Sequence, residues 1–79
     1  MVSIRQVKAA RALLGWSQDD LATRSGVSKP TIARLETNDS GALGGYADTR
    51  NKLLGALEAA GVIFIDENGE GPGVRLRKP

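Results

Sequence analysis

The chain of 79 residues is long enough for a single domain with a modest hydrophobic core. It contains no Cys and no His, which excludes thiolate chemistry, soft metal sites and the side chain that most often transfers protons near neutral pH. We therefore expect no enzyme activity, no cofactor and no metal site. The net charge is only +2, but residues 1–36 carry six basic and three acidic side chains, which is +3, so the basic excess lies at the N-terminal end.

The first helix is expected over residues 4–14. Ser3 and Gln6 have the spacing of a capping box, and Gly15 supplies a C-terminal stop. Apolar residues recur on one side at helical spacing, namely Ile4, Val7, Ala10 and Leu14. The opposite side carries basic residues that we interpret as a solvated helix face, outside any binding site: Arg5, Lys8 and Arg11.

The second helix is expected over residues 18–25. Ser17 and Asp20 have the spacing of a second capping box. Trp16 and Leu21 occupy the two positions of a hydrophobic staple, which fixes the angle at which the chain enters the helix. We interpret Trp16 as this staple residue and not as a platform for stacked bases.

A third short helix, over residues 29–37, follows almost at once. Gly26 can adopt the left-handed conformation that ends the second helix, and Ser28 begins the third helix with Pro30 in its first turn. The side of this helix that faces inward carries two apolar residues, Ile32 and Leu35.

Two short helices joined through a small residue form a helix-turn-helix, in which the first helix crosses the DNA backbone and the second enters the major groove. Ala22 falls where the two helices must approach closely, and Gly26 falls in the turn. A larger residue at position 22 would push the helices apart, and a β-carbon at position 26 would penalise a left-handed backbone by about 1 kcal/mol. The interrupted helix therefore indicates a DNA-binding unit.

The run GWSQDDLATRSGVSKPTIARLE resembles the lambda-repressor-like (XRE/Cro-type) helix-turn-helix regulators. The resemblance is strong over residues 3–36 and extends more weakly through LLGALEAAG and GVIFID. It implies four or five short helices, sequence-specific binding of double-stranded DNA by a transcriptional regulator, in particular a repressor, and usually a homodimer. No apolar run approaches the roughly 20 residues that span a bilayer, so we expect no membrane contact and a cytoplasmic, bacterial nucleoid-associated protein.

By position, the resemblance also implies a set of DNA-binding residues. Gln18 matches a second-helix glutamine that contacts a phosphate and steadies the recognition helix, and Thr37 matches a position near the DNA backbone. The recognition-helix positions that face bases and adjoining phosphates are matched by Ser28, Lys29, Pro30, Thr31 and Arg34. Because Arg can contact guanine through two hydrogen bonds, we expect Arg34 to contribute most to specificity.

The remaining chain predicts a loop, one more helix and a hairpin. Residues 38–46 have no usable periodicity, and they lack the basic, proline-containing loop found in many members of the family. The longest helix is expected from about Ala47, with Gly61 as its stop and an apolar face made of Leu53, Leu54, Leu57 and Ala60. Residues 62–65 and 74–77 then alternate as the strands of a β-hairpin.

The segment DENGEG between these strands matches the opening of a calcium loop. The twelfth position of such a loop requires a glutamate but is Arg77, so we interpret the segment as a hairpin turn. The fold class is therefore mainly α, with four to five helices and a C-terminal β-hairpin. We expect a helix-turn-helix domain at residues 1–61 and a hairpin at residues 62–79.

An isolated two-stranded hairpin is marginally stable in water, so this one must pack on the helices, pair with another strand, or do both. If Val62 and Phe64 cover the helical core, Ile63 and Ile65 stay exposed unless a second subunit covers them. We expect a homodimer whose interface contains Ile63, Phe64, Ile65, Val74 and Leu76, with recognition helices about 34 Å apart. A hairpin folded back on its own helices in a monomer is the alternative.

A second class of function also stays open at this point. The chain could be a protein-interaction module, such as an antitoxin-like partner of a toxin or regulator, in which DNA binding is secondary. The low net charge and the acidic Asp39 favour this alternative. The polar and basic outward positions of the third helix favour DNA binding, because a helix that docks on a protein should expose an apolar stripe.

Overall fold

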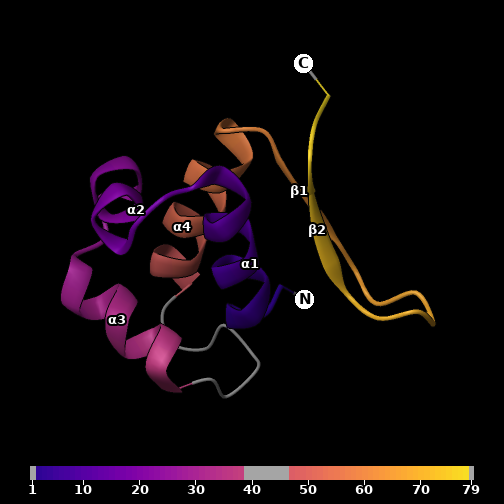
Figure 1. The fold of residues 1–79 in the computed structure, drawn as a ribbon. Helices are drawn as coiled ribbons and strands as arrows, with labels where there is room; N and C mark the ends of the chain where they lie inside the picture. Colours follow the sequence, from indigo (N-terminus) through magenta and orange to yellow (C-terminus); the bar gives the residue numbers. More distant parts are fainter. Residues whose placement is uncertain (1, 39–46, 79) are drawn as a thin grey trace.

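The computed structural model describes residues 2–38 and 47–78, and within these residues it contains four helices followed by an antiparallel hairpin (Figure 1). The elements are α1 (Ile4–Leu14), α2 (Gln18–Ser25), α3 (Lys29–Asn38), α4 (Ala47–Ala59), β1 (Val62–Ile65) and β2 (Gly73–Leu76). The sequence-based bounds are confirmed to within about one residue. The sequence predicts a loop over residues 38–46, but Asn38 is the last residue of α3, and residues 39–46 lie outside the described residues.

The first two helices begin and end as their local sequence predicts. Ser3 with Gln6, and Ser17 with Asp20, both form complete capping boxes, in which side chain and backbone bond reciprocally across the first turn. Gly26 ends α2 with a left-handed backbone at φ 77°. A β-carbon there would meet no described atom within 4 Å, so the backbone conformation, and not a lack of space, favours glycine.

One hydrophobic core joins all the helices to the hairpin. Its buried residues are Ile4, Val7, Ala10, Leu21, Val27, Ile32, Leu53, Leu57 and Val62. Val62 is only 1% exposed, although it lies beyond the expected domain boundary at residue 61. The boundary is therefore a change from helix to strand, and the core continues across it.

The hairpin packs on α1 and α4, on the side away from α2 and α3 (Figure 1). Its register pairs Val62 with Leu76 and Phe64 with Val74, so these four side chains share one face of the ribbon. Phe64 and Val74 pack against the core. Of the alternatives that the sequence left open, packing of the hairpin on its own helices is therefore present.

Gln6 connects the turn end of the hairpin to α1. Its amide nitrogen Nε2 donates to the carbonyl oxygens of Ile65 at 3.2 Å and Gly73 at 3.0 Å, and its Oε1 accepts from the N–H of Ser3 at 2.9 Å. Gln6 is 5% exposed, and a buried amide is costly unless it is bonded in this way. The capping box predicted the contact with Ser3, but no local pattern predicted the two contacts with the strands.

The turn between the strands is held by its own side chains. One carboxylate oxygen of Glu67, Oε1, accepts hydrogen bonds from the backbone N–H groups of Gly69 at 2.7 Å and Gly71 at 2.8 Å. The bonds from Gly71 and Gly69 lower the pKa of Glu67 below its ordinary value. The segment that opens like a calcium loop thus uses this carboxylate to close a hairpin turn.

Candidate nucleic-acid interface

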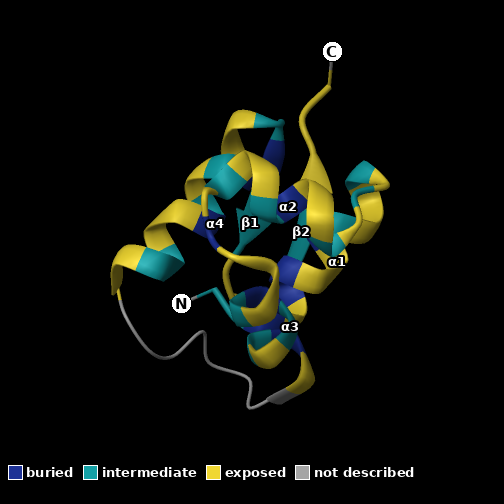
Figure 2. Ribbon diagram, turned by 90° about the vertical axis from the view of Figure 1, so that its left-hand side faces the viewer, coloured by how far each residue is buried: buried dark blue, intermediate teal, exposed yellow. Residues whose placement is uncertain are grey.

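Helix α3 has one buried side and one exposed side. Ile32 is 1% exposed and Leu35 packs against the core, so the predicted inward side is confirmed. Lys29, Arg34 and Thr37 are exposed. Figure 2 views the molecule from the side occupied by α2 and α3 in Figure 1, and it shows exposed and half-buried residues along α3. The outward side of this helix is therefore polar and basic, which suits a DNA groove.

The residues predicted to contact DNA lie on two neighbouring helices. Five of them are exposed, namely Ser28, Lys29, Pro30, Arg34 and Thr37, whereas Gln18 and Thr31 are half-buried. Gln18 begins α2, Ser28 immediately precedes α3, and the others lie on α3, which packs against α2. Their contacts with DNA stay a prediction.

Several of these side chains already have protein partners. The Lys29 ammonium lies 3.3 Å from the carboxylate of Asp19, and both side chains are mostly exposed. Such a surface pair contributes about 0–1 kcal/mol, so Lys29 can exchange Asp19 for a DNA phosphate at little cost. The hydroxyls of Ser28 and Thr31 lie 2.9 Å apart and are hydrogen-bonded. Among the described residues no ion-pair or hydrogen-bond partner engages the Arg34 side chain, which leaves its guanidinium available for a base.

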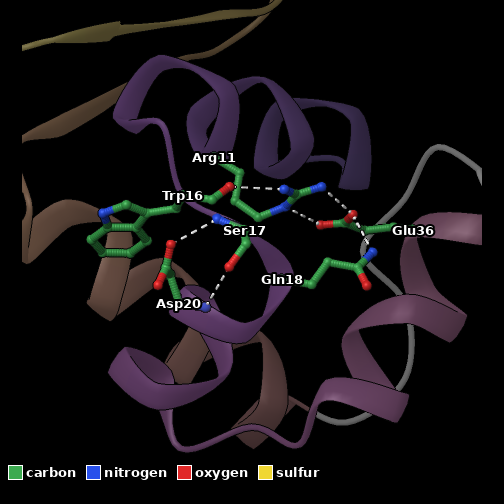
Figure 3. Close-up of polar contacts among 6 residues, drawn as sticks. All are labelled: Arg11, Trp16, Ser17, Gln18, Asp20 and Glu36. Atoms are coloured by element: carbon green, nitrogen blue, oxygen red, sulfur yellow. Dashed lines mark hydrogen bonds and ion pairs between the residues drawn. The ribbon is translucent and has the colours of Figure 1, made fainter.

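A polar network behind α3 joins the first three helices (Figure 3). Arg11 on α1 donates two parallel hydrogen bonds to the carboxylate of Glu36, from Nε to Oε2 at 3.0 Å and from Nη2 to Oε1 at 2.7 Å. Gln18 on α2 donates from Nε2 to the same Oε1 at 3.0 Å. Glu36 is 5% exposed, so α3 carries a buried charge that is held by a guanidinium and an amide. The predicted contact of Gln18 with the recognition helix is thus present.

The interpretation of Arg11 as part of a solvated face is wrong. Its side chain is only 21% exposed, and besides gripping Glu36 it donates from Nη1 to the carbonyl oxygen of Trp16 at 2.9 Å. Lys8, on the same helix, is exposed as expected. The signal that sequence reasoning missed is Glu36 itself, since an acid four residues after the buried Ile32 falls on the inward side of the helix and needs a buried partner.

Trp16 connects the end of α1 to α2. It packs against the core that contains Leu21, as the hydrophobic staple predicts, and the guanidinium carbon of Arg24 lies 5.2 Å from the centre of its ring. The backbone N–H of Trp16 also donates to the carbonyl oxygen of Arg11 at 2.9 Å. The chain between the two helices is therefore fixed on both sides, which sets the position of α2 and of Gln18.

The protonation of Glu36 depends on this network. Burial alone would raise the pKa of Glu36, but the hydrogen bonds from Arg11 and Gln18, with the positive charge of Arg11, lower it below its ordinary value of 4.5. The bond to Glu36 likewise raises the pKa of Arg11, so this residue stays charged. Both partners are thus ionised at neutral pH.

We expect the network to make the stability of the fold depend on pH below about 4.5. A carboxylate whose pKa is lowered on folding stabilises the fold above its unfolded pKa, and this stabilisation is lost as the pH falls through the folded value. Glu36→Gln should therefore be less stable than the native chain at pH 7, and the difference should shrink on acidification. Urea unfolding of both proteins from pH 7 to pH 3 measures this. A difference that does not change with pH would contradict the assignment.

Comparison with known proteins points to the same region of the chain as the helix-turn-helix. No curated protein matches the sequence. No helix within the described residues has the length and apolar content that crossing a bilayer requires. A family model described as Helix-turn-helix matches residues 7–43, which include α2, the turn at Gly26 and α3. The match covers 37 of the 79 residues, and over residues 7–43 the chain is similar to the lambda-repressor-like (XRE-type) helix-turn-helix regulators, as the sequence predicts.

Proposed function

We propose that the chain is a sequence-specific repressor that binds double-stranded DNA with α3 in the major groove. The observation that carries this proposal is the division of α3 into two sides. Its inward side is fixed by Ile32 in the core and by Glu36 in the network with Arg11 and Gln18. Its outward side offers Arg34 and Lys29 to a polyanion. A reading helix needs both a rigid backing and exposed hydrogen-bond donors.

The proposed roles follow from the chemistry of each side chain. Arg34 reads a guanine through two hydrogen bonds, and Lys29 contacts a base or a neighbouring phosphate after leaving Asp19. Gln18 donates one amide N–H to Glu36 and directs its second amide N–H to a phosphate oxygen. Smaller contacts to bases and backbone come from the exposed end of the turn and the outward side of α3, namely Ser28, Pro30, Thr31 and Thr37.

We also propose that the repressor acts as a homodimer. The hairpin lies on the side of the molecule away from α2 and α3, so contact between two hairpins leaves both reading helices open to DNA (Figure 1). A two-fold axis then presents the helices to half-sites one DNA turn, roughly 34 Å, apart. Repression follows most simply from occupation of a promoter by such a dimer.

The test of DNA reading begins with selection of bound sites from random duplex DNA, followed by titration of the variant Arg34→Ala. We expect Arg34→Ala to lose about 1–3 kcal/mol on the selected site and to relax the preference at one base position, because a bidentate contact discriminates against the wrong base by that amount. Lys52→Ala, which removes one positive charge from α4, is the matched control and should change affinity much less. An equal loss of affinity for all DNA sequences would show that Arg34 contacts only a phosphate, which contradicts its proposed contact with a base.

The salt dependence of binding separates this function from an antitoxin-like protein-interaction module. Neutralisation of several phosphates releases counterions, so affinity for duplex DNA should fall steeply with salt. The exposed charges on α3 favour this result over an apolar docking helix. Capture of a protein partner that resists salt, without affinity for duplex DNA, would instead support the interaction module.

A further inference from the structure

The hairpin has an outer face that no described helix covers. The register pairs Ile63 with Arg75 and Ile65 with Gly73, and because opposite residues point to the same side, these four positions form what we call the outer hairpin face. Ile63 and Ile65 are half-buried, and the helices that contact the hairpin, α1 and α4, lie against the opposite face, where Phe64 packs on the core (Figure 1). Two branched apolar side chains therefore lie toward solvent.

The shape of this face allows close approach of another molecule. A β-carbon on Gly73 would lie 4.0 Å from Cδ1 of Ile65, so the isoleucine extends across the glycine and leaves a low apolar surface there. Beside it, at the free end of β2, a partly open hollow of about 310 Å³ is lined by Ile63, Arg75, Leu76, Arg77 and Lys78. The outer surface is thus apolar in the middle and basic at one end.

Charge is divided between the two ends of the hairpin. The turn carries three exposed acidic residues, Asp66, Glu67 and Glu70. The last part of β2 and the residues after it carry three exposed basic residues, Arg75, Arg77 and Lys78. Hydrogen bonds from the backbone N–H groups of Gly71 and Gly69 hold the pKa of Glu67 below its ordinary value, so this carboxylate stays charged. Four-residue strands separate the two ends by roughly 13 Å at about 3.3 Å per residue.

We propose that the outer hairpin face binds the same face of a second copy of this chain, with the two hairpins antiparallel about a two-fold axis. The acidic turn of each copy then lies over the basic end of the other, and Ile63 and Ile65 of both copies are buried between them. This inference depends on the proposed function only in one respect, namely that the dimer serves to place two recognition helices on DNA. Its chemistry rests on the hairpin alone.

A second copy fits this surface better than another partner because the surface complements itself. An antiparallel arrangement brings the acidic turn of each copy over the basic end of the other, whereas a two-fold axis along the strands would place acid on acid and base on base. Pairing of β-strand edges would satisfy backbone groups but would leave Ile63 and Ile65 in water. The charge pattern and the apolar centre therefore select the same arrangement.

The residues of this interface differ in part from those expected from the sequence. Phe64 and Val74 are half-buried and pack against the chain's own core, so we place them beneath the hairpin and outside the proposed interface. Ile63 and Ile65 remain in the interface, and Leu76, which is 42% exposed, lies at its basic edge. The proposed interface also contains Arg75 and the charged residues at the two ends of the hairpin, which the sequence-based expectation did not include.

Charge reversal at the two ends tests the arrangement. Glu70→Lys and Arg77→Glu, each at an exposed position, should each weaken dimerisation about tenfold or more, because like charges then meet at both ends of the interface. The double variant Glu70→Lys/Arg77→Glu should recover dimerisation. A mixture of the two single variants should form heterodimers about as strong as the native dimer, since every contact is again between opposite charges. Sedimentation over a concentration series measures all four.

Asp48→Lys, which makes the same charge change at the N-terminal end of α4, is the matched control and should sediment like the native chain. Ile63→Ser should also yield monomers, because it removes apolar area from the centre of the interface. A native chain that is monomeric at high micromolar concentration overturns the inference, as does a double variant that is no better than the single ones. A monomer that still binds a single half-site overturns this inference alone, and a dimer without affinity for duplex DNA overturns the proposed function alone.

Discussion

Replacement of Arg11 by Ala is expected to lower the free energy of unfolding by about 3 kcal/mol, because removal of one partner leaves a buried charge without compensation. Glu36 has a side chain only 4% exposed, so water cannot replace the two bonds from the guanidinium. The bond from Arg11 to the carbonyl oxygen of Trp16 is lost as well. We take the lower end of the usual range because the Arg11 side chain itself is 21% exposed.

Two further variants isolate the pair from the rest of α1. Lys8→Ala removes an exposed positive charge from the same helix and should cost less than about 0.5 kcal/mol. Replacement of both Arg11 and Glu36 by Met should recover most of the lost stability, since a buried ion pair exchanged for apolar groups of similar volume is often close to neutral. Urea unfolding at pH 7 gives these values. If Arg11→Ala costs as much when Glu36 is already Met, the two residues are not coupled and the explanation fails.

Leu21→Ala should destabilise the fold by about 2–5 kcal/mol, the range expected when a buried leucine is truncated and leaves a cavity. Leu21 is 0% exposed and is the only buried residue of α2, a helix of 8 residues. Helices of that length are not stable alone, so α2 depends on this contact and on its neighbours for its position. Because Gln18 is on the same helix, we expect DNA affinity to fall together with stability.

Thermal unfolding with a DNA titration below the melting temperature checks this result. Thr23→Ala, at an exposed position on α2, is the matched control and should change stability by less than about 0.5 kcal/mol. Leu21→Met keeps the volume and should cost less than about 1.5 kcal/mol. An Leu21→Ala protein with native stability would show that α2 is held by its caps alone, which contradicts the described core.

The sequence determined those features whose causes lie within a few residues of each other. The capping boxes at Ser3 and Ser17 each join residues three apart, and Gly26 ends α2 through its own backbone angle. The apolar spacing of Ile32 and Leu35 likewise fixed which side of α3 faces inward. These signals are local, so they are readable without the fold, and they sufficed to identify the helix-turn-helix.

Only the tertiary structure decided which polar groups meet inside the molecule. Arg11 and Glu36 are 25 residues apart, and the amide of Gln6 reaches carbonyl oxygens 59 and 67 residues away. An isolated sequence shows that Glu36 is charged and lies on an inward side, but its partner depends on how α1 crosses α3. For the same reason, alternation along the hairpin predicted its two faces, whereas the packing of Phe64 and Val74 on the core decided which of them stays open. Long-range pairing is set by the packing of whole elements against one another, and that packing is where the two buried polar contacts and the outer hairpin face were determined.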